Sequence, residues 1–290
     1  MTCLVNYDGT ILPESEARVP VLDRGFLFGD SIYEVLRTRR GRFIGLEDHL
    51  ARLHRSADRL RLVVPLSDDE LVARCRDTVA AAANDESYVR VILTRGTGAA
   101  PNIDLRYAPE VPTLLILVRP LPTPPADLLT RGLSAWLVTT RRNDRRALDP
   151  AIKSGNYLNN IMGLMEAQDR GADTALFLNT QGNLTEAPTA NAWIVSGGRI
   201  LTPPLEAGIL EGVTRGLLLE MGRELRLPME ERDLDEAALR SAEEVFLSST
   251  ISDISPVTRL DGRPIGDGRP GPVALDLAAR FPDWLDARGG

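Results

Sequence analysis

The segment Ile152-Lys153-Ser154-Gly155-Asn156-Tyr157 contains the only lysine of this 290-residue chain. The other 33 of its 34 basic residues are arginine. Both residue types supply positive charge, but only lysine offers a primary amine for Schiff-base chemistry. Small and polar neighbours leave that amine room to react. Lys153 is therefore a candidate catalytic residue, although a solvated loop lysine fits the same pattern.

The composition limits the class of protein in which this lysine acts. Hydrophobic residues make up 43% and charged residues 26% of the chain, as in ordinary globular proteins. The net charge of −7 argues against binding nucleic acid or an anionic membrane. The 2 cysteines and 2 histidines are too few for a disulfide framework, a histidine-ligated metal site or a Ser-His-Asp triad. We expect a cytoplasmic protein without a metal site, a nucleic-acid partner or a membrane segment.

A proline-rich segment separates two patterned halves of the chain. Arg119-Pro120-Leu121-Pro122-Thr123-Pro124-Pro125 is typical of a stiff joint between domains. We therefore predict an N-terminal domain at residues 1–119, a linker at 120–126 and a C-terminal domain at 127–290.

The two halves differ in their predicted elements. In the first, apolar spacing predicts a helix from Leu46 to Leu60, and the capping box Ser67-Asp68-Asp69-Glu70 begins another. Strands are predicted at 88–94 and 113–118. The second half is richer in short strands and hairpins, predicted at 134–140, 174–179, 184–186, 192–195, 200–202 and 245–247, with helices from about 158 and from 212. Because the strands cluster in hairpins and no Gly-x-Gly-x-x-Gly follows one, the pattern favours an α+β fold over a dinucleotide-binding fold.

Three features of the second half suit one cofactor. Lys153 offers an amine, and Glu186 is a carboxylate at the end of a short strand. Backbone N–H groups at Gly212-Val213-Thr214 and the hydroxyls of Ser249 and Thr250 can bind a phosphate. Pyridoxal phosphate needs these three functions: an imine partner, a group that keeps its pyridine nitrogen protonated, and an anion site. Taken singly, each feature also has a plainer reading as a loop lysine, a surface carboxylate or a helix cap.

The sequence resembles the class IV aminotransferases, which are pyridoxal-phosphate enzymes of fold type IV. The resemblance spans nearly the whole chain and rests on six ordered blocks. These are Asp23-Arg24-Gly25-Phe26-Leu27-Phe28-Gly29-Asp30-Ser31-Ile32-Tyr33-Glu34-Val35, His49-Leu50-Ala51-Arg52-Leu53, residues 153–160, 184–191, 208–215 and 249–257. It implies a two-domain fold like that of D-amino-acid aminotransferase, with a small α/β N-terminal domain and a larger hairpin-rich C-terminal domain.

The resemblance also implies roles for the residues that would bind the cofactor. The phosphate would be bound by Arg52, by the backbone N–H groups of Val213 and Thr214, and by the hydroxyl of Thr250, with Ser249 beside it.

The ring and the reacting amine are assigned in the same way. Tyr157 would approach the phenolic oxygen and Glu186 the pyridine nitrogen. Lys153 would be the imine partner at rest and then the base that moves a proton at the substrate's α-carbon.

The substrate is less sharply defined. Candidate partners of its carboxylate are Tyr33, Arg90, Arg37 and Arg24, the last of which could reach a neighbouring subunit's site. Arg90 shares a predicted strand face with Tyr88, Ile92 and Thr94 and could make a bidentate contact, unless it is an exposed strand arginine. The Arg-x-His carboxylate trap of well-known D-amino-acid transaminases is missing from residues 97–103.

Two subgroups of the family share features with this chain. Residues 28–35 look like D-amino-acid transaminases, whereas Tyr88-Val89-Arg90 and Gly155-Asn156-Tyr157 are more like branched-chain enzymes. We favour transfer of an amino group from a D-amino acid, such as D-alanine or D-glutamate, to 2-oxoglutarate or pyruvate. A branched-chain L-amino-acid aminotransferase is the main alternative, and an R-selective amine transaminase, aminodeoxychorismate lyase or a non-catalytic cofactor-binding protein stay open. The resemblance implies a homodimer.

Overall fold

The computed structural model describes residues 2–288, which divide into two compact units. The first unit comprises residues 1–122 together with 152–156, and the second comprises 123–151 and 157–290. The chain therefore changes unit near the predicted proline-rich joint. It also returns to the first unit for the five residues around Lys153, whereas the sequence pattern placed all of 127–290 in one domain.

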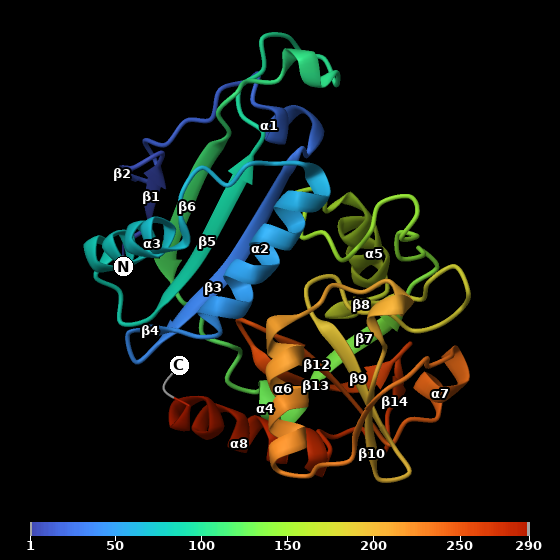
Figure 1. The fold of residues 1–290 in the computed structure, drawn as a ribbon. Helices are drawn as coiled ribbons and strands as arrows, with labels where there is room; N and C mark the ends of the chain where they lie inside the picture. The colour runs from blue at the N-terminus through green and yellow to red at the C-terminus, as the bar shows by residue number, and fades with distance from the viewer. Residues whose placement is uncertain (1, 289–290) are drawn as a thin grey trace. The chain divides into compact units, whose positions relative to one another are not determined.

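The first unit is a sheet covered on one face by helices (Figure 1). The strand order is β2-β1-β6-β5-β3-β4. Its elements are β1 (Leu4–Tyr7), β2 (Thr10–Pro13), α1 (Arg24–Phe28), β3 (Ser31–Arg39), β4 (Arg42–Phe43), α2 (Leu46–Leu60), α3 (Asp68–Ala82), β5 (Ser87–Thr94), the 3-10 turn Leu105–Tyr107 and β6 (Thr113–Pro120). The helices and strands predicted here are confirmed, including the capping box, in which the Ser67 hydroxyl accepts from the Glu70 N–H.

Strand register determines which side chains of the first sheet share a face. β3 pairs antiparallel with β5, and β5 with β6. Alternate residues such as Ile32, Leu36 and Val91 pack into the core against α2 and α3. The opposite face presents Tyr33 and, diagonally across the pair, Arg90. The expectation that Arg90 shares a face with Tyr88, Ile92 and Thr94 is confirmed by this register.

The second unit contains a mixed sheet of order β11-β10-β9-β12-β13-β7-β8, with β14 paired to β13 (Figure 1). Its elements are α4 (Leu128–Arg131), β7 (Leu133–Leu137), α5 (Leu158–Asp169), β8 (Thr174–Leu176), β9 (Asn191–Ser196), β10 (Arg199–Thr202), the 3-10 turn Leu205–Ala207, α6 (Val213–Glu224), β11 (Met229–Glu231), α7 (Glu236–Arg240), β12 (Glu244–Ser249), β13 (Asp253–Leu260), β14 (Arg263–Pro264) and α8 (Pro272–Ala287).

The second sheet agrees with an α+β fold, and it contains one strand pairing that the sequence pattern did not predict. The β9–β10 hairpin forms as predicted. The run from Thr174 gives β8, which pairs parallel with β7, and the predicted hairpin follows directly. In that hairpin the Phe177 N–H donates to the Glu186 carbonyl, the Thr185 N–H donates to the Phe177 carbonyl, and Leu178 bridges antiparallel to Leu184. A parallel neighbour requires a long crossover. The segment 138–173, which contains α5, supplies that crossover. Within residues 2–288, no helix is both long enough and apolar enough to span a bilayer.

Candidate active site

Lys153 lies on an added edge of the first sheet. Its carbonyl oxygen accepts from the Tyr33 N–H at 3.0 Å, and the Gly155 N–H donates to the Ser31 carbonyl at 2.8 Å. Gly155 and Ser31 lie very close together, since a Cβ atom added to Gly155 would lie 2.1 Å from the Ser31 hydroxyl oxygen. The Lys153 N–H also donates to the Ser56 hydroxyl of α2 at 3.2 Å. Main-chain bonds therefore fix the position of Lys153 in the first unit.

Two cationic side chains contact the Tyr33 ring beside this edge. The Lys153 ammonium lies 4.4 Å from the centroid of the Tyr33 ring, and the Arg90 guanidinium carbon lies 3.8 Å from it. Both distances are typical of cation–π contacts. Tyr33 is buried, whereas Lys153 and Arg90 are partly exposed. The structure thus brings together the predicted catalytic lysine and two of the predicted carboxylate partners.

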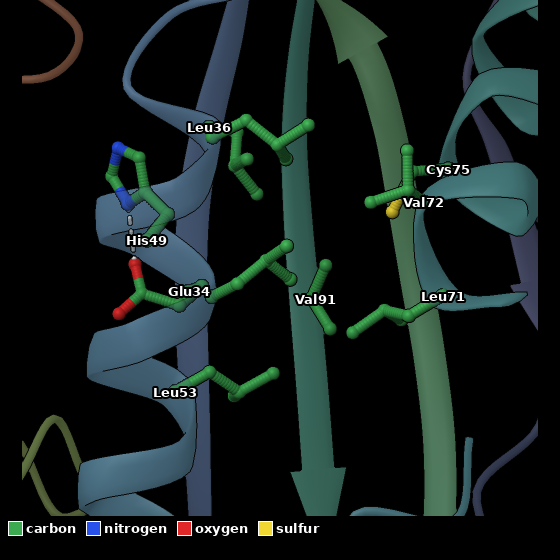
Figure 2. Close-up of a pocket in the computed structure, with 10 residues that line it drawn as sticks. Glu34, Leu36, His49, Leu53, Leu71, Val72, Cys75 and Val91 are labelled. Atoms are coloured by element: carbon green, nitrogen blue, oxygen red, sulfur yellow. Dashed lines mark hydrogen bonds and ion pairs between the residues drawn. The ribbon is translucent and has the colours of Figure 1, made fainter. Parts of the chain in front are cut away.

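Arg52 lies on the helix side of the same sheet in a buried ion pair. Its Nε and Nη2 donate to the two carboxylate oxygens of Glu34 at 2.7 and 2.8 Å. The Nδ1 of His49 lies 2.7 Å from the same carboxylate (Figure 2). Burial would raise the pKa of Glu34, but the charge and hydrogen bonds of Arg52, with the hydrogen bond of His49, hold that pKa well below its usual range. The ion pair orients Arg52 on α2.

Unlike the charged Glu34 and Arg52 beside it, His49 has surroundings that favour its neutral form. Burial lowers its pKa, against the effect of Glu34, and Arg52 and Lys153 act in the same direction as burial. Its Nε2 is among the buried side-chain atoms without a hydrogen-bond partner in the described residues. Apolar side chains, including Leu53, line the small cavity beside it (Figure 2). We infer that His49 is neutral near pH 7.

Acidification is expected to lower the free energy of unfolding, in part through His49. Because the pKa of His49 is lowered in the folded state, the unfolded chain takes up a proton first as the pH falls. Stability should then decrease below about pH 6.5, by up to about 1.4 kcal/mol per pH unit. Urea unfolding between about pH 7 and pH 5 measures this slope. His49→Gln should flatten it; an unchanged slope would contradict the assignment. The matched variant is His54→Gln, at an exposed site.

In the second unit, hydrogen-bond donors bind both carboxylate oxygens of Glu186. The Arg142 Nε donates to Oε1 at 2.9 Å, and the Leu210 N–H donates to Oε2 at 3.0 Å. The Asn191 amide lies 3.4 Å from Oε2 and also donates to the Leu210 carbonyl. Glu186 is 4% exposed and Arg142 8%. A buried carboxylate therefore lies at one end of β9, where Glu186 bridges to Asn191.

The predicted phosphate-binding groups lie near this carboxylate. α6 begins at Val213 after Gly212, and within the described residues no side chain caps that helix start. Its first N–H groups can bind an anion. Asn191 pairs in register with Ser248 of β12, which places the following Ser249 and Thr250 at the same end of the sheet. The structure therefore brings together Glu186, the start of α6 and the two hydroxyl residues.

Gly212 is expected to be needed for this arrangement. A Cβ there would lie 1.8 Å from the Asn191 carboxamide oxygen, so Asn191 would have to leave Glu186 and Leu210. We expect Gly212→Ala to lower stability by about 1–3 kcal/mol and to weaken retention of pyridoxal phosphate. Gly216→Ala, on the same helix, is the control: its added methyl would have no atom within 4 Å, so it should be neutral or stabilising. Thermal unfolding and cofactor fluorescence report both effects; equal behaviour of the two variants would contradict the prediction.

The remaining predicted residues lie in different surroundings. Arg24 is buried, pairs with Asp30 and donates to the carbonyls of Asn102 and Ile103, so it ties down the loop that follows β5. Arg37 is buried on β3. Tyr157 is half-buried and directly precedes α5 in the second unit. The roles proposed for these three residues stay predictions.

Two residues of the site were not singled out from the sequence as site residues. Glu34 stands in a quoted block, and its position one residue after Tyr33 indicates the opposite strand face, where a carboxylate needs a cation such as Arg52. Arg142 belongs to the pair Arg141-Arg142, and nothing in the sequence indicates which of the two is buried.

Each unit contains groups of the kind that pyridoxal phosphate needs. The second unit offers an uncapped helix start, which a Cβ at Gly212 would disturb, and a buried carboxylate. The first unit offers the lysine amine and a buried arginine. When bound, the cofactor supplies a conjugated ring that withdraws electrons from the substrate's α-carbon.

Comparison with known proteins identifies the family. The sequence profile of the amino-transferase class IV family matches residues 31–260. A D-alanine aminotransferase of Bacillus licheniformis is 33% identical over 273 residues, covering 94% of each chain. A Methanocaldococcus jannaschii protein, provisionally assigned as a branched-chain-amino-acid aminotransferase, is 33% identical over 280 residues, covering 96% of this chain and 95% of its own.

Solved structures give the same result. The pyridoxal-phosphate form of the branched-chain aminotransferase of Thermobaculum terrenum has a TM-score of 0.86 at 28% identity, covering 98% of this chain and 94% of its own. The Escherichia coli branched-chain enzyme has a TM-score of 0.89 at 28% identity, covering 97% of this chain and 94% of its own. The chain belongs to the class IV aminotransferases. It is a pyridoxal-phosphate-dependent transaminase of fold type IV whose substrates are amino and keto acids, as the sequence blocks predicted.

Proposed function

We propose that this chain is a cytoplasmic transaminase that moves an amino group from a D-amino acid, such as D-alanine or D-glutamate, to 2-oxoglutarate or pyruvate. The observation that carries the proposal is the position of Lys153 beside Tyr33 and Arg90, because it places a reactive amine next to a cation that can bind a carboxylate. The free thiols Cys3 and Cys75 are consistent with a reducing compartment.

Each unit contributes different groups to the proposed chemistry. In the first, Lys153 carries the cofactor through its amine and later moves the proton at the substrate's α-carbon, and Arg52 binds phosphate.

In the second unit, Glu186 pairs with the pyridine nitrogen and Tyr157 approaches the phenolic oxygen. Phosphate is bound by the N–H groups at the start of α6 and by the hydroxyls after β12. The residues of that phosphate site are Val213, Thr214, Ser249 and Thr250.

The choice of a D-amino acid rests on the Bacillus licheniformis relative and on the block at residues 28–35. Ala100 and Asn102 stand in the loop where an Arg-x-His pair would bind the carboxylate, so another cation must do so. Arg90 is the proposed substitute, since it is held against Tyr33. The branched-chain L-amino-acid activity is the second candidate, favoured by the solved structures of branched-chain enzymes.

The visible absorption spectrum distinguishes these substrates. D-Alanine and L-leucine are added separately to the purified, cofactor-loaded protein without a keto acid, and loss of the band of the lysine-bound cofactor reports amino transfer. Conversion by D-alanine only supports the proposal, whereas conversion by L-leucine only assigns the branched-chain activity. An R-amine without a carboxylate, and a search for released pyruvate from an aminodeoxychorismate-type substrate, test the remaining alternatives.

We also propose a homodimer formed through α5. Apolar side chains repeat at helical spacing along one exposed stripe of this helix. They are Leu158 (63% exposed), Ile161 (48%), Met162 (53%) and Met165 (57%). Sedimentation should show a dimer that Met162→Glu dissociates and that Gln181→Glu, in an exposed turn outside α5, leaves intact. A monomer at micromolar concentration would contradict the proposal.

A further inference from the structure

Arg142 is a buried cation that the chemistry described so far does not use. Its Nη1 donates to the carboxamide oxygens of Asn159 at 2.9 Å and Asn160 at 3.2 Å, both on α5. Its backbone N–H donates to the Leu178 carbonyl at 2.9 Å. Both the main chain and the side chain of Arg142 are therefore fixed, and the guanidinium presents its Nε to Glu186.

The contact between Arg142 and Glu186 is expected to affect the carboxylate itself more than the stability of the fold. A buried ion pair often adds little net stability, because desolvation offsets the attraction. The charge-assisted hydrogen bond at 2.9 Å, however, is strong only while the carboxylate is negatively charged. The Leu210 N–H on the other oxygen acts in the same sense. Together these donors fix the orientation of the Glu186 carboxylate.

We propose that Arg142 is a positioning residue for cofactor protonation: by binding Oε1 of Glu186 it keeps the shared proton on the pyridine nitrogen instead of on the carboxylate. The inference rests on the proposed pairing of Glu186 with that nitrogen. A proton between an acid and a base resides on the partner with the higher proton affinity. The charged guanidinium donates to Oε1 at 2.9 Å and so stabilises the carboxylate anion, which leaves the ring with the positive charge that withdraws electrons.

The test is the 15N resonance of the pyridine nitrogen in holoenzyme loaded with 15N-labelled pyridoxal phosphate. We expect Arg142→Gln to move the resonance toward the unprotonated position and Arg142→Lys, which keeps the charge, to restore much of the wild-type value. Arg146→Gln is the matched control. It removes an arginine from the same segment whose side chain is 88% exposed and paired with Asp144, so its resonance should coincide with the wild type.

Glu186→Gln separates this inference from the function on which it rests. A resonance that moves in Glu186→Gln but not in Arg142→Gln overturns the role of Arg142 and leaves that of Glu186. A resonance that is unchanged in Glu186→Gln overturns both. If Arg142→Gln does not fold, Asn159→Ala loosens the guanidinium from a half-buried position. It should move the resonance in the same direction by a smaller amount, and no movement in this variant overturns the role of Arg142.

Discussion

Replacing Lys153 with alanine is expected to abolish transamination, with a loss in turnover of about 10²–10⁴-fold or more. The loss should be chemical and not structural. The bonds that hold this position to β3 are made by the main-chain atoms of Lys153 and Gly155 and by Tyr33 and Ser31, so alanine preserves them. What disappears is the amine beside the Tyr33 ring. Single-turnover kinetics with a saturating amino donor measure the effect.

Because the chain contains a single lysine, chemical labelling can identify the residue that binds the cofactor. Borohydride reduction of the cofactor-loaded enzyme should attach the cofactor to one peptide, because Lys153 is the only lysine side chain in the chain. Lys153→Arg keeps a cation but cannot act as a base, so it should be as inactive as Lys153→Ala. A Lys153→Ala variant that turns over at the wild-type rate would refute the assigned role.

The substitution Glu34→Gln is expected to cost about 3–5 kcal/mol of stability, although it changes one atom. Glu34 and Arg52 are 2% and 4% exposed, and the glutamine leaves the guanidinium buried without its counter-charge. An amide can still accept one hydrogen bond, but it cannot reproduce the two-oxygen contact. Urea unfolding should show a lower midpoint with an unchanged slope on denaturant concentration.

An exposed carboxylate provides the comparison for Glu34. Asp276 pairs with Arg280 one turn along α8, with about half of each side chain exposed, so Asp276→Asn should change the unfolding midpoint little. Similar midpoints for Glu34→Gln and Asp276→Asn would show that the buried network contributes no more than a surface pair.

Local sequence patterns predicted much of the fold because they depend on interactions between residues that are near one another in the sequence. The capping box at Ser67 satisfies helix N–H groups within four residues, and alternation along β5 reflects a sheet with one face on a core. The parallel pairing of β7 with β8 depends on a crossover of more than thirty residues and has no local signal. The pairing of β8 with β7 was not predicted for that reason, whereas the local hairpin after β8 was.

The residues of the candidate site also differ in how far the sequence alone predicts them. Lys153 was predicted as a site residue from its chemistry, because one primary amine in an arginine-rich chain is distinctive, and Glu186 from its place in a motif. The buried ion-pair partners of Glu186 and Arg52 were not predictable from the sequence. Arg142 meets Glu186 across 44 residues of sequence and Arg52 meets Glu34 across 18. Such pairings arise from tertiary packing, for which a single sequence carries no periodic pattern.

The short segment around Lys153 has a consequence for cutting or recombining the gene. An N-terminal fragment ending at Pro122 would lack residues 152–156, and with them the strand partner of β3. The Tyr33 N–H and the Ser31 carbonyl would then face solvent along an open strand edge, which is a template for intermolecular association. A truncated first half should therefore self-associate unless the missing five residues are grafted back through a linker. Domain exchange between relatives would likewise need three splice points instead of one.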